Sequence, residues 1–156
     1  EAVVAAYPDA RFVMTHRDPA KSIPSYASLV ASIFPAAADP AGHDMKKLGP
    51  EVSNHMREGM EHAMAARARI GEDRFLDVHH EDLNTDPLGT VARVYDFLGL
   101  ALDGYVEGSI DEWQKANRTG AKGAHSYSPE QFGLGADQLH DDFDFYIRRF
   151  DVRVDG

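Results

Sequence analysis

The chain has 156 residues, 43% of them hydrophobic, which is enough for one domain with a real core, and we predict a single domain over residues 1–156. A formal net charge of −10 argues against a broad nucleic-acid interface, because such a surface needs many basic residues to replace the counterions of the phosphates. Cysteine is absent, which excludes disulfides. No apolar run approaches the ~20 residues of a membrane span, and no signal peptide is visible, so we expect a cytoplasmic protein.

A strand, a turn and a helix are predicted near the start of the chain. Residues 12–14 form a short apolar run, typical of a strand that is buried on both faces. Asp18 and Pro19 then offer a helix cap and a proline at the first helical position, where its missing N–H costs nothing. Pro24 lies inside this helix, which is therefore either distorted there or begins near Ser22.

Arg17 stands at the junction of this strand and helix. In open α/β sheets, ligands bind at the carboxyl ends of strands, where helix N-termini present unpaired N–H groups. The planar guanidinium can hold a phosphate through two parallel hydrogen bonds, and Ser25 can add a hydroxyl from the first turns of the helix. Lys21 and Ser22 are further donors nearby. A local salt bridge between Arg17 and Asp18 is the alternative.

The next segments are read as a loop and a long helix. Residues 34–50 are rich in proline, glycine and small side chains, which favours a loop. Apolar residues at helical spacing predict an amphipathic helix over residues 51–70, with methionines that fill the core. His55 and His62 share a face of this helix, but no third ligand stands at a diagnostic spacing, so no metal site is predicted.

A second strand is predicted over residues 74–79. Residues 79–83 then lie at the same edge of the sheet as Arg17 if the two strands run parallel. Two histidines and two acids follow one another from His79 to Asp82. Neighbouring residues of an extended chain point to opposite faces, so these side chains are not expected to converge on one ion.

Three helical segments are predicted in the rest of the chain. One is capped by Asp86 and ended by Gly99. A second covers residues 102–113, with Trp113 as a core anchor. The last covers residues 139–150; one face is apolar, and four polar residues are expected on its solvated side. These are His140, Asp141, Asp142 and Asp144.

Residues 118–125, RTGAKGAH, form a basic and glycine-rich segment. The backbone at Gly120 and Gly123 can approach an anion closely while Arg118 and Lys122 neutralise it. Such segments are also common in ordinary turns. Shortly after it, residues 128–131 have the spacing of a capping box that starts a short helical turn.

These motifs resemble, in order, those of sulfotransferases that use 3′-phosphoadenosine 5′-phosphosulfate (PAPS). In that family a strand ends in Arg-Asp-Pro and a helical serine follows eight residues after the arginine, positions that correspond to Arg17 and Ser25 and imply contacts with the 3′-phosphate. The family often carries Tyr-Glu-Asp-Leu after the next strand, with the tyrosine against the adenine. His80 takes the place of that tyrosine here.

The basic segment resembles the Arg-Lys-Gly-x-x-Gly loop with which the family clasps the same 3′-phosphate. Arg118, Gly120 and Gly123 match that pattern, whereas Thr119 stands where lysine is usual. The hypothesis is that Lys122 replaces the lost charge. The resemblance runs from about residue 7 to residue 134, and its last part is similar to a bacterial branch of the family.

The resemblance implies an α/β fold of the P-loop NTPase type, a parallel sheet with flanking helices, of which this chain is the C-terminal part. The family's phosphate-binding loop with its lysine, and its general base, precede the matched segments, so no catalytic residue is assigned and we expect the 156 residues alone to be inactive. The implied reaction transfers a sulfuryl group from PAPS to a hydroxyl or amine of a small-molecule, glycan or lipid acceptor.

Two alternatives stay open at this point. A related P-loop phosphotransferase would bind ATP and magnesium and would be indifferent to a 3′-phosphate. A non-catalytic interaction domain would use Arg17 and Arg118 as surface salt-bridge residues far apart in space.

Overall fold

The computed structural model describes residues 1–33, 44–117 and 128–154. The chain divides into two compact units. The sheet unit comprises Glu1–His16 and Arg69–His125, and the helical unit comprises Arg17–Ala68 and Ser126–Gly156. Within the described ranges, no helix has both the length and the apolar character that crossing a membrane requires. The prediction of a single domain over residues 1–156 stays a prediction.

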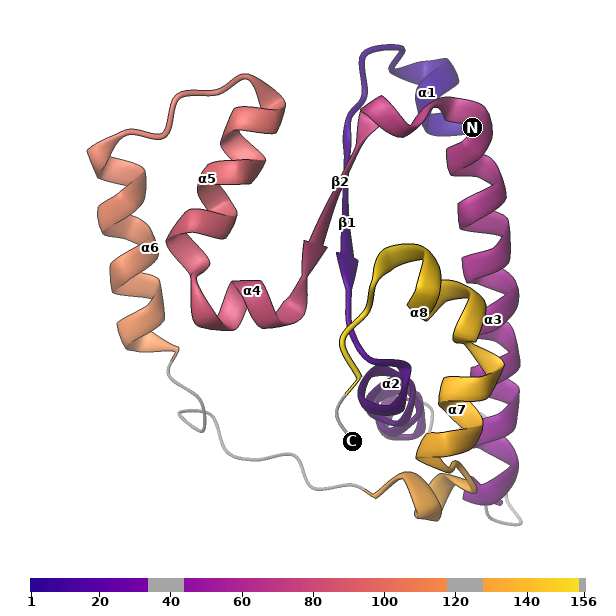
Figure 1. Ribbon diagram of the computed structural model, residues 1–156. Helices are drawn as coiled ribbons and strands as arrows, with labels where there is room; N and C mark the ends of the chain where they lie inside the picture. Colours follow the sequence, from indigo (N-terminus) through magenta and orange to yellow (C-terminus); the bar gives the residue numbers. More distant parts are fainter. Residues whose placement is uncertain (34–43, 118–127, 155–156) are drawn as a thin grey trace. The chain divides into compact units, whose positions relative to one another are not determined.

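The sheet unit contains two parallel strands, β1 (Phe12–His16) and β2 (Phe75–His79), which lie side by side in Figure 1. They pair residue for residue, from Phe12 opposite Phe75 to His16 opposite His79. The rings of Phe12 and Phe75 stack with centroids 4.8 Å apart. Both predicted strands and their parallel direction are confirmed, so the two carboxyl ends lie at the same edge of the sheet. The expected burial of β1 on both faces is wrong, because Val13 is 42% exposed.

Short helices complete the sheet unit. They are α1 (Ala2–Ala6), the 3₁₀ helix η1 (Glu72–Arg74), α4 (His80–Thr85), α5 (Pro87–Leu98) and α6 (Gly104–Ala116). Helices α4 and α5 contact β2, and α5 also contacts α6, which runs in the opposite direction beside it (Figure 1). The predicted cap of α5 is confirmed, because the Asp86 carboxylate accepts the N–H of Gly89 at 3.0 Å. Gly99 ends this helix at φ 72°.

The extended conformation expected for residues 79–83 is wrong. The chain turns at His79 and begins α4 at His80. Glu81 and Asp82 occupy the first turn of α4, where negative charge stabilises the positive end of the helix dipole.

The helical unit is built from α2 (Pro19–Ile33), most of α3 (Met45–Ile70), the 3₁₀ helix η2 (Pro129–Phe132), α7 (Ala136–Asp142) and α8 (Asp144–Phe150). Helix α2 packs against α7 and η2. Apolar side chains from these elements and from the residues next to them form the core of the unit. The most buried of them are Ile23, Ala27, Val52, Phe132, Leu134, Leu139, Phe143, Tyr146, Phe150 and Val152.

Helix α2 begins at Pro19 and continues through Pro24. The alternative start near Ser22 is therefore wrong. Pro24 removes one helical hydrogen bond, but its ring is almost fully buried beside Ile23, so apolar burial offsets part of that cost.

The predicted loop over residues 34–50 is wrong at its end, and residues 34–43 lie outside the described part of the chain. Helix α3 already begins at Met45, because Asp44 acts as a cap: its carboxylate accepts the N–H of Lys46 at 3.2 Å. Pro50 and Gly49 obscured this start in the sequence. Gly49 is buried, and a Cβ there would collide with the carbonyl oxygen of Phe132.

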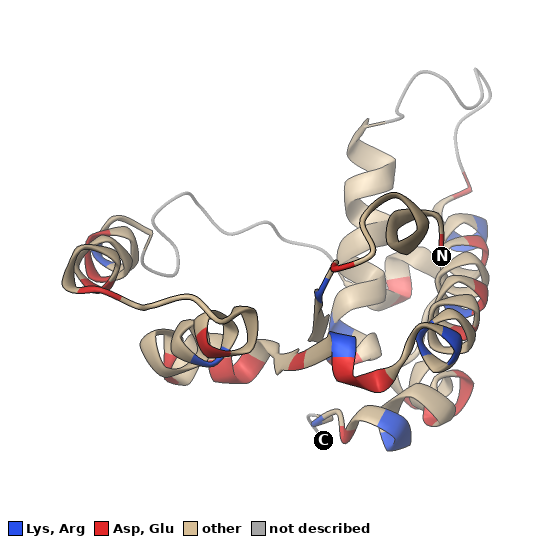
Figure 2. Ribbon diagram, turned by 90° about the horizontal axis from the view of Figure 1, so that it is seen from above, with Lys and Arg blue, Asp and Glu red and all other residues tan. Residues whose placement is uncertain are grey.

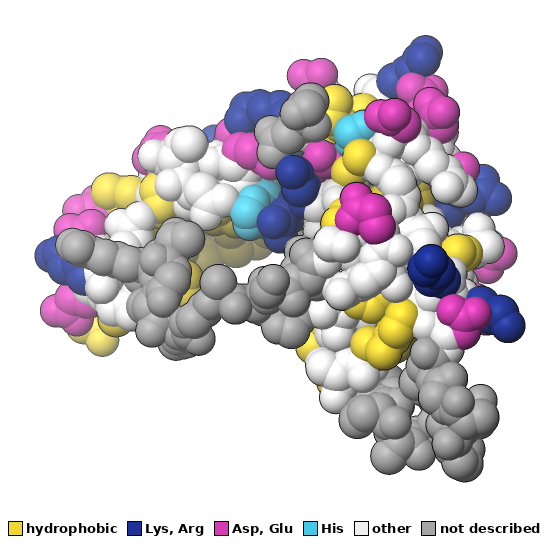
Figure 3. Space-filling view, turned by 90° about the horizontal axis from the view of Figure 1, so that it is seen from below, with side chains coloured by type: hydrophobic (Ala, Val, Ile, Leu, Met, Phe, Trp, Pro, Cys, Tyr) yellow, Lys and Arg dark blue, Asp and Glu magenta, His cyan; other side chains and the backbone are white. Residues whose placement is uncertain are grey.

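The methionines predicted to fill the core do so only in part. Val52 of α3 is buried, but Met56 is 36% exposed, and Met60 and Met64 are half-buried. Positions of both charge signs are interspersed along the described helices (Figure 2). Hydrophobic side chains reach the surface in separate patches between them (Figure 3).

The predicted last helix is divided into α7 and α8 at Phe143. The apolar face is confirmed, because Leu139, Phe143 and Tyr146 are buried. The predicted turn at residues 128–131 is confirmed as η2, but the Ser128 side chain makes no capping bond to its backbone. The backbone N–H of Glu130 and, with a smaller effect, the hydroxyl of Ser128 hydrogen-bond the carboxylate of Glu130 and lower its pKa.

Candidate cofactor site

Arg17 lies between the end of β1 at His16 and the start of α2 at Pro19. Its side chain is exposed, and no described residue forms an ion pair with the guanidinium. The predicted alternative of an Arg17–Asp18 salt bridge is wrong. The backbone N–H of Arg17 donates to the hydroxyl of Tyr146 at 3.3 Å, so the main chain is held while the charged group faces solvent.

Asp18 caps the start of α2. Its carboxylate accepts the N–H of Ala20 at 2.8 Å, and its carbonyl oxygen accepts the N–H groups of Lys21 and Ser22 at 3.0 and 2.9 Å. The hydroxyl of Ser22 also donates to this carbonyl oxygen, at 3.1 Å. The expected supply of unpaired N–H groups at this helix end is therefore wrong, and an anion bound here would have to be held by side chains.

Ser25 lies on the second turn of α2 and is half-buried. No hydrogen bond of its hydroxyl to another described residue is present, whereas Ser22 is already committed to Asp18. Within the helical unit, Arg17 and Ser25 are thus the two predicted anion donors whose polar groups the described residues leave unoccupied.

The edge of the sheet unit is lined by histidines. His16 is fully buried, and its Nε2 lies 2.8 Å from a carboxylate oxygen of Asp77. The rings of His16 and His79 are 5.6 Å apart. His79 Nδ1 and one carboxylate oxygen of Glu81 are buried, and no described residue forms a hydrogen bond with either atom. This edge is polar and closely packed, which suits a structural role for His16.

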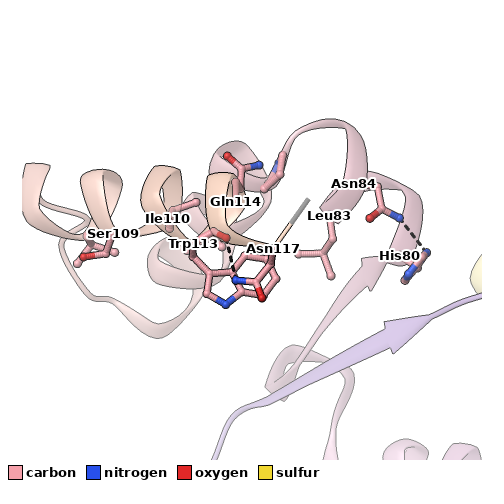
Figure 4. A pocket seen from close by; sticks show the side chains of 11 residues that line it. His80, Leu83, Asn84, Ser109, Ile110, Trp113, Gln114 and Asn117 are labelled. Atoms are coloured by element: carbon pink, nitrogen blue, oxygen red, sulfur yellow. Dashed lines mark hydrogen bonds between the residues drawn. The ribbon is translucent and has the colours of Figure 1, made fainter. Parts of the chain in front are cut away.

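His80 begins α4 and lines a pocket of about 640 Å³ between α4, α5 and α6 (Figure 4). Its Nδ1 lies 3.1 Å from the side-chain nitrogen of Asn84. Across the pocket stands Trp113, whose carbonyl oxygen accepts the side-chain N–H of Asn117 at 2.9 Å. The full lining is His80, Leu83, Asn84, Pro87, Val91, Val106, Ser109, Ile110, Trp113, Gln114 and Asn117.

The lining of this pocket, as far as the structure describes it, contains no Asp, Glu, Lys or Arg. Apolar walls with amide and hydroxyl groups between them suit an uncharged ring with a few hydrogen-bonding atoms and do not suit a phosphate. The prediction of Trp113 as a core anchor is wrong, because this side chain is 66% exposed. Val106, Ile110 and Gln114 are the half-buried residues of α6, and all three line the pocket together with the exposed Trp113.

The remaining predicted site residues lie outside the described part of the chain. They are Arg118, Thr119, Gly120 and Lys122. Their contacts, and the predicted convergence of Arg118 with Arg17, stay predictions.

Residues 1–104 match the sulfotransferase family. The chain belongs to this family. The match agrees with the prediction made from Arg17-Asp18-Pro19 and the segment after β2, and it favours the sulfotransferase over the two alternatives.

Two solved sulfotransferases resemble this family member. Sulfotransferase STF9 from Mycobacterium avium has 25% sequence identity and a TM-score of 0.80, over 99% of this chain and 40% of that one. Sulfotransferase STF1 from Mycobacterium tuberculosis H37Rv has 30% identity and a TM-score of 0.70, over 91% of this chain and 35% of that one. The chain thus spans two fifths or less of these structures. No curated protein matches it.

These likenesses confirm the predicted fold class, an α/β protein of the P-loop type with a parallel sheet and flanking helices. Sequence reasoning did not find Trp113 and His140 as candidate site residues. The sequence showed that Trp113 lies at helical spacing from Val106 and Ile110. It could not show which side of α6 is covered, because that depends on how α5 packs against α6.

Proposed function

We propose that the protein transfers a sulfuryl group from PAPS to a hydroxyl or amine, and that this chain supplies the 3′-phosphate and adenine parts of the cofactor site. The observation that carries the proposal is the exposed guanidinium of Arg17, in a chain that belongs to the sulfotransferase family. Its main chain is bonded at the end of β1, and its guanidinium is exposed without an ion-pair partner among the described residues.

The proposed 3′-phosphate site uses charge and hydrogen bonds together. The guanidinium of Arg17 offers two parallel N–H groups that match two phosphate oxygens, and the hydroxyl of Ser25 offers one more donor. The basic segment around Arg118, with Thr119, Gly120 and Lys122, is proposed to close the site from the other side. Side chains carry this site, because Asp18 already bonds the backbone N–H groups at the start of α2.

The proposed adenine site is the neutral pocket beside His80. The amide of Asn84 donates to Nδ1 of His80, so the ring proton resides on Nε2, which can donate to a nitrogen of the base. Trp113 supplies an exposed aromatic face on which a base can stack. The absence of charged groups from the described lining favours an uncharged base over a phosphate at this place.

In the proposed reaction, the acceptor oxygen or nitrogen forms a bond to sulfur as the bond from sulfur to the phosphate oxygen of PAPS breaks. The acceptor proton must pass to a base, and 3′,5′-bisphosphoadenosine leaves. The residues of this chain are assigned to holding the cofactor, and no catalytic base is assigned among them. The proposed acceptors are small molecules, glycans or lipids that carry a hydroxyl or amine.

The proposal is tested with the full-length protein and ³⁵S-labelled PAPS against pools of phenols, glycans and glycolipids. We expect label to appear in one pool, with acceptor-dependent release of bisphosphoadenosine. Arg17→Ala should reduce this release at least tenfold. The control Arg57→Ala, an exposed arginine of α3 that pairs with Glu61, should leave it unchanged. No release with any pool, together with no binding of PAPS, contradicts the proposal.

A further inference from the structure

Side chains of the two C-terminal helices of the same unit, α7 and α8, form hydrogen bonds with the turn that carries Arg17. Asp18 is only 2% exposed, and Nε2 of His140 on α7 donates to its carboxylate at 2.9 Å. The hydroxyl of Tyr146 on α8 accepts the N–H of Arg17 at 3.3 Å. Two neighbouring residues of the turn therefore have one anchor each, from two different helices.

The hydrogen bond from His140 stabilises the buried carboxylate of Asp18. The Asp18 carboxylate caps Ala20 while it is buried at the start of α2. A buried carboxylate is costly unless several donors surround it, and His140 supplies a donor that the local backbone does not. The prediction that placed His140 on the solvated side of its helix is wrong for this reason. Asp141, Asp142 and Asp144 are exposed, as predicted.

Tyr146 combines a packing role with a polar one. Its side chain is 5% exposed, and its ring lies 5.5 Å from the ring of Phe150. A phenylalanine would fill the same space, but it would leave the N–H of Arg17 without this acceptor. The hydroxyl thus acts on the main chain of the turn rather than on the core.

We propose that His140 and Tyr146 are positioning residues of the 3′-phosphate site, an inference that rests on the proposed function of Arg17. Each fixes the backbone on one side of the Arg17 Cα, so that the exposed guanidinium starts from one main-chain position. Less conformational freedom is then lost when a phosphate binds. The C-terminal helices α7 and α8 are in this way part of the cofactor site without touching the cofactor.

The test measures dissociation constants of 3′,5′-bisphosphoadenosine and 5′-AMP for the full-length protein and its Tyr146→Phe, His140→Leu and His140→Gln variants. We expect Tyr146→Phe and His140→Leu to reduce the preference for the 3′-phosphate threefold to tenfold, while 5′-AMP affinity stays within twofold. His140→Gln keeps a side-chain donor and should recover part of the preference. Phe132→Leu, a core change in η2 of the same unit, controls for lost stability.

The outcomes separate this inference from the proposed function. A wild-type protein without a preference for the 3′-phosphate overturns the proposed function and this inference together. A wild-type preference that survives in both Tyr146→Phe and His140→Leu overturns the inference alone. The same holds if Phe132→Leu, at an equal loss of melting temperature, reduces the preference as much.

Discussion

Nε2 of His16 lies 2.8 Å from Oδ1 of Asp77. This contact joins β1 to β2, although the two residues are 61 positions apart in the sequence. The histidine is fully buried, whereas the side chain of Asp77 is one third exposed. If β1 slipped by two residues along β2, each side chain would keep its face of the sheet, but the bond between His16 and Asp77 would be lost. This bond therefore favours the one register in which His16 stands opposite His79.

Replacing His16 should destabilise the sheet unit. His16→Leu leaves the strand apolar but removes the hydrogen bond to Asp77, and we expect the free energy of unfolding to fall by about 1–3 kcal/mol. Urea denaturation followed by circular dichroism measures this change. Asp96→Asn, at an exposed acid of α5, should change stability by less than about 0.5 kcal/mol. Equal stabilities for the two variants argue against a register role for His16.

Two glycines of α3 should respond in opposite directions to alanine. Gly49 lies against η2, and a Cβ there would collide with the carbonyl oxygen of Phe132 and come 2.8 Å from Cγ of Leu134, so Gly49→Ala should cost about 1–3 kcal/mol. Gly59 has nothing within 4 Å of its Cβ position, and Gly59→Ala should gain about 0.5–1 kcal/mol of helix stability. Thermal unfolding of both variants checks the pair. Stabilisation by Gly49→Ala contradicts the packing of α3 on η2.

Trp113 should report on nucleotide binding directly, because it is the only tryptophan of the chain. If a base stacks on Trp113, bisphosphoadenosine and 5′-AMP should both quench its fluorescence. In the full-length protein, any tryptophan outside these 156 residues is replaced by phenylalanine so that the signal comes from Trp113 alone. Trp113→Ala should weaken the binding of both nucleotides by about 1–3 kcal/mol without changing the ratio of their dissociation constants. Tyr105 is an 83% exposed aromatic residue of α6 outside the pocket, so Tyr105→Ala should bind as the wild type does. Unchanged affinity in Trp113→Ala excludes stacking there.

Short-range signals in the sequence were enough to predict much of the fold. Asp18-Pro19 and Asp86-Pro87 each placed a helix start correctly, because a cap and a first-turn proline act within one turn of the chain. The two strands could be predicted for a similar reason, since their apolar runs are bounded by polar residues. Their parallel pairing was conditional and was established by the structure.

Features that depend on distant residues could not be predicted in this way. Gly49 reads as a helix breaker until its contact with Phe132, more than eighty residues later, is known. His140 reads as a surface residue until Asp18 is found beside it, 122 residues away. Periodicity showed that Trp113 shares a face with Ile110, but it could not show that this face borders a pocket.

The candidate site was predicted from its motifs rather than from its packing. Arg17, Ser25 and His80 have described positions that suit the roles implied by the family resemblance, with an exposed guanidinium, an unoccupied hydroxyl and a place in a neutral pocket. The proposed anion site was assigned to side-chain donors, rather than to the N–H groups at the start of α2, only when the bonds of Asp18 were known.

The role of Arg17 is tested most directly by calorimetry that compares the binding of 3′,5′-bisphosphoadenosine with that of 5′-AMP, using the full-length protein, Arg17→Ala and the control Arg57→Ala. We expect a preference of tenfold or more for the bisphosphate, about 1.4 kcal/mol, in the wild type and in Arg57→Ala, and its loss in Arg17→Ala. Equal binding of the two nucleotides by the wild-type protein, or a preference that persists in Arg17→Ala, would contradict the assignment of Arg17 to the 3′-phosphate.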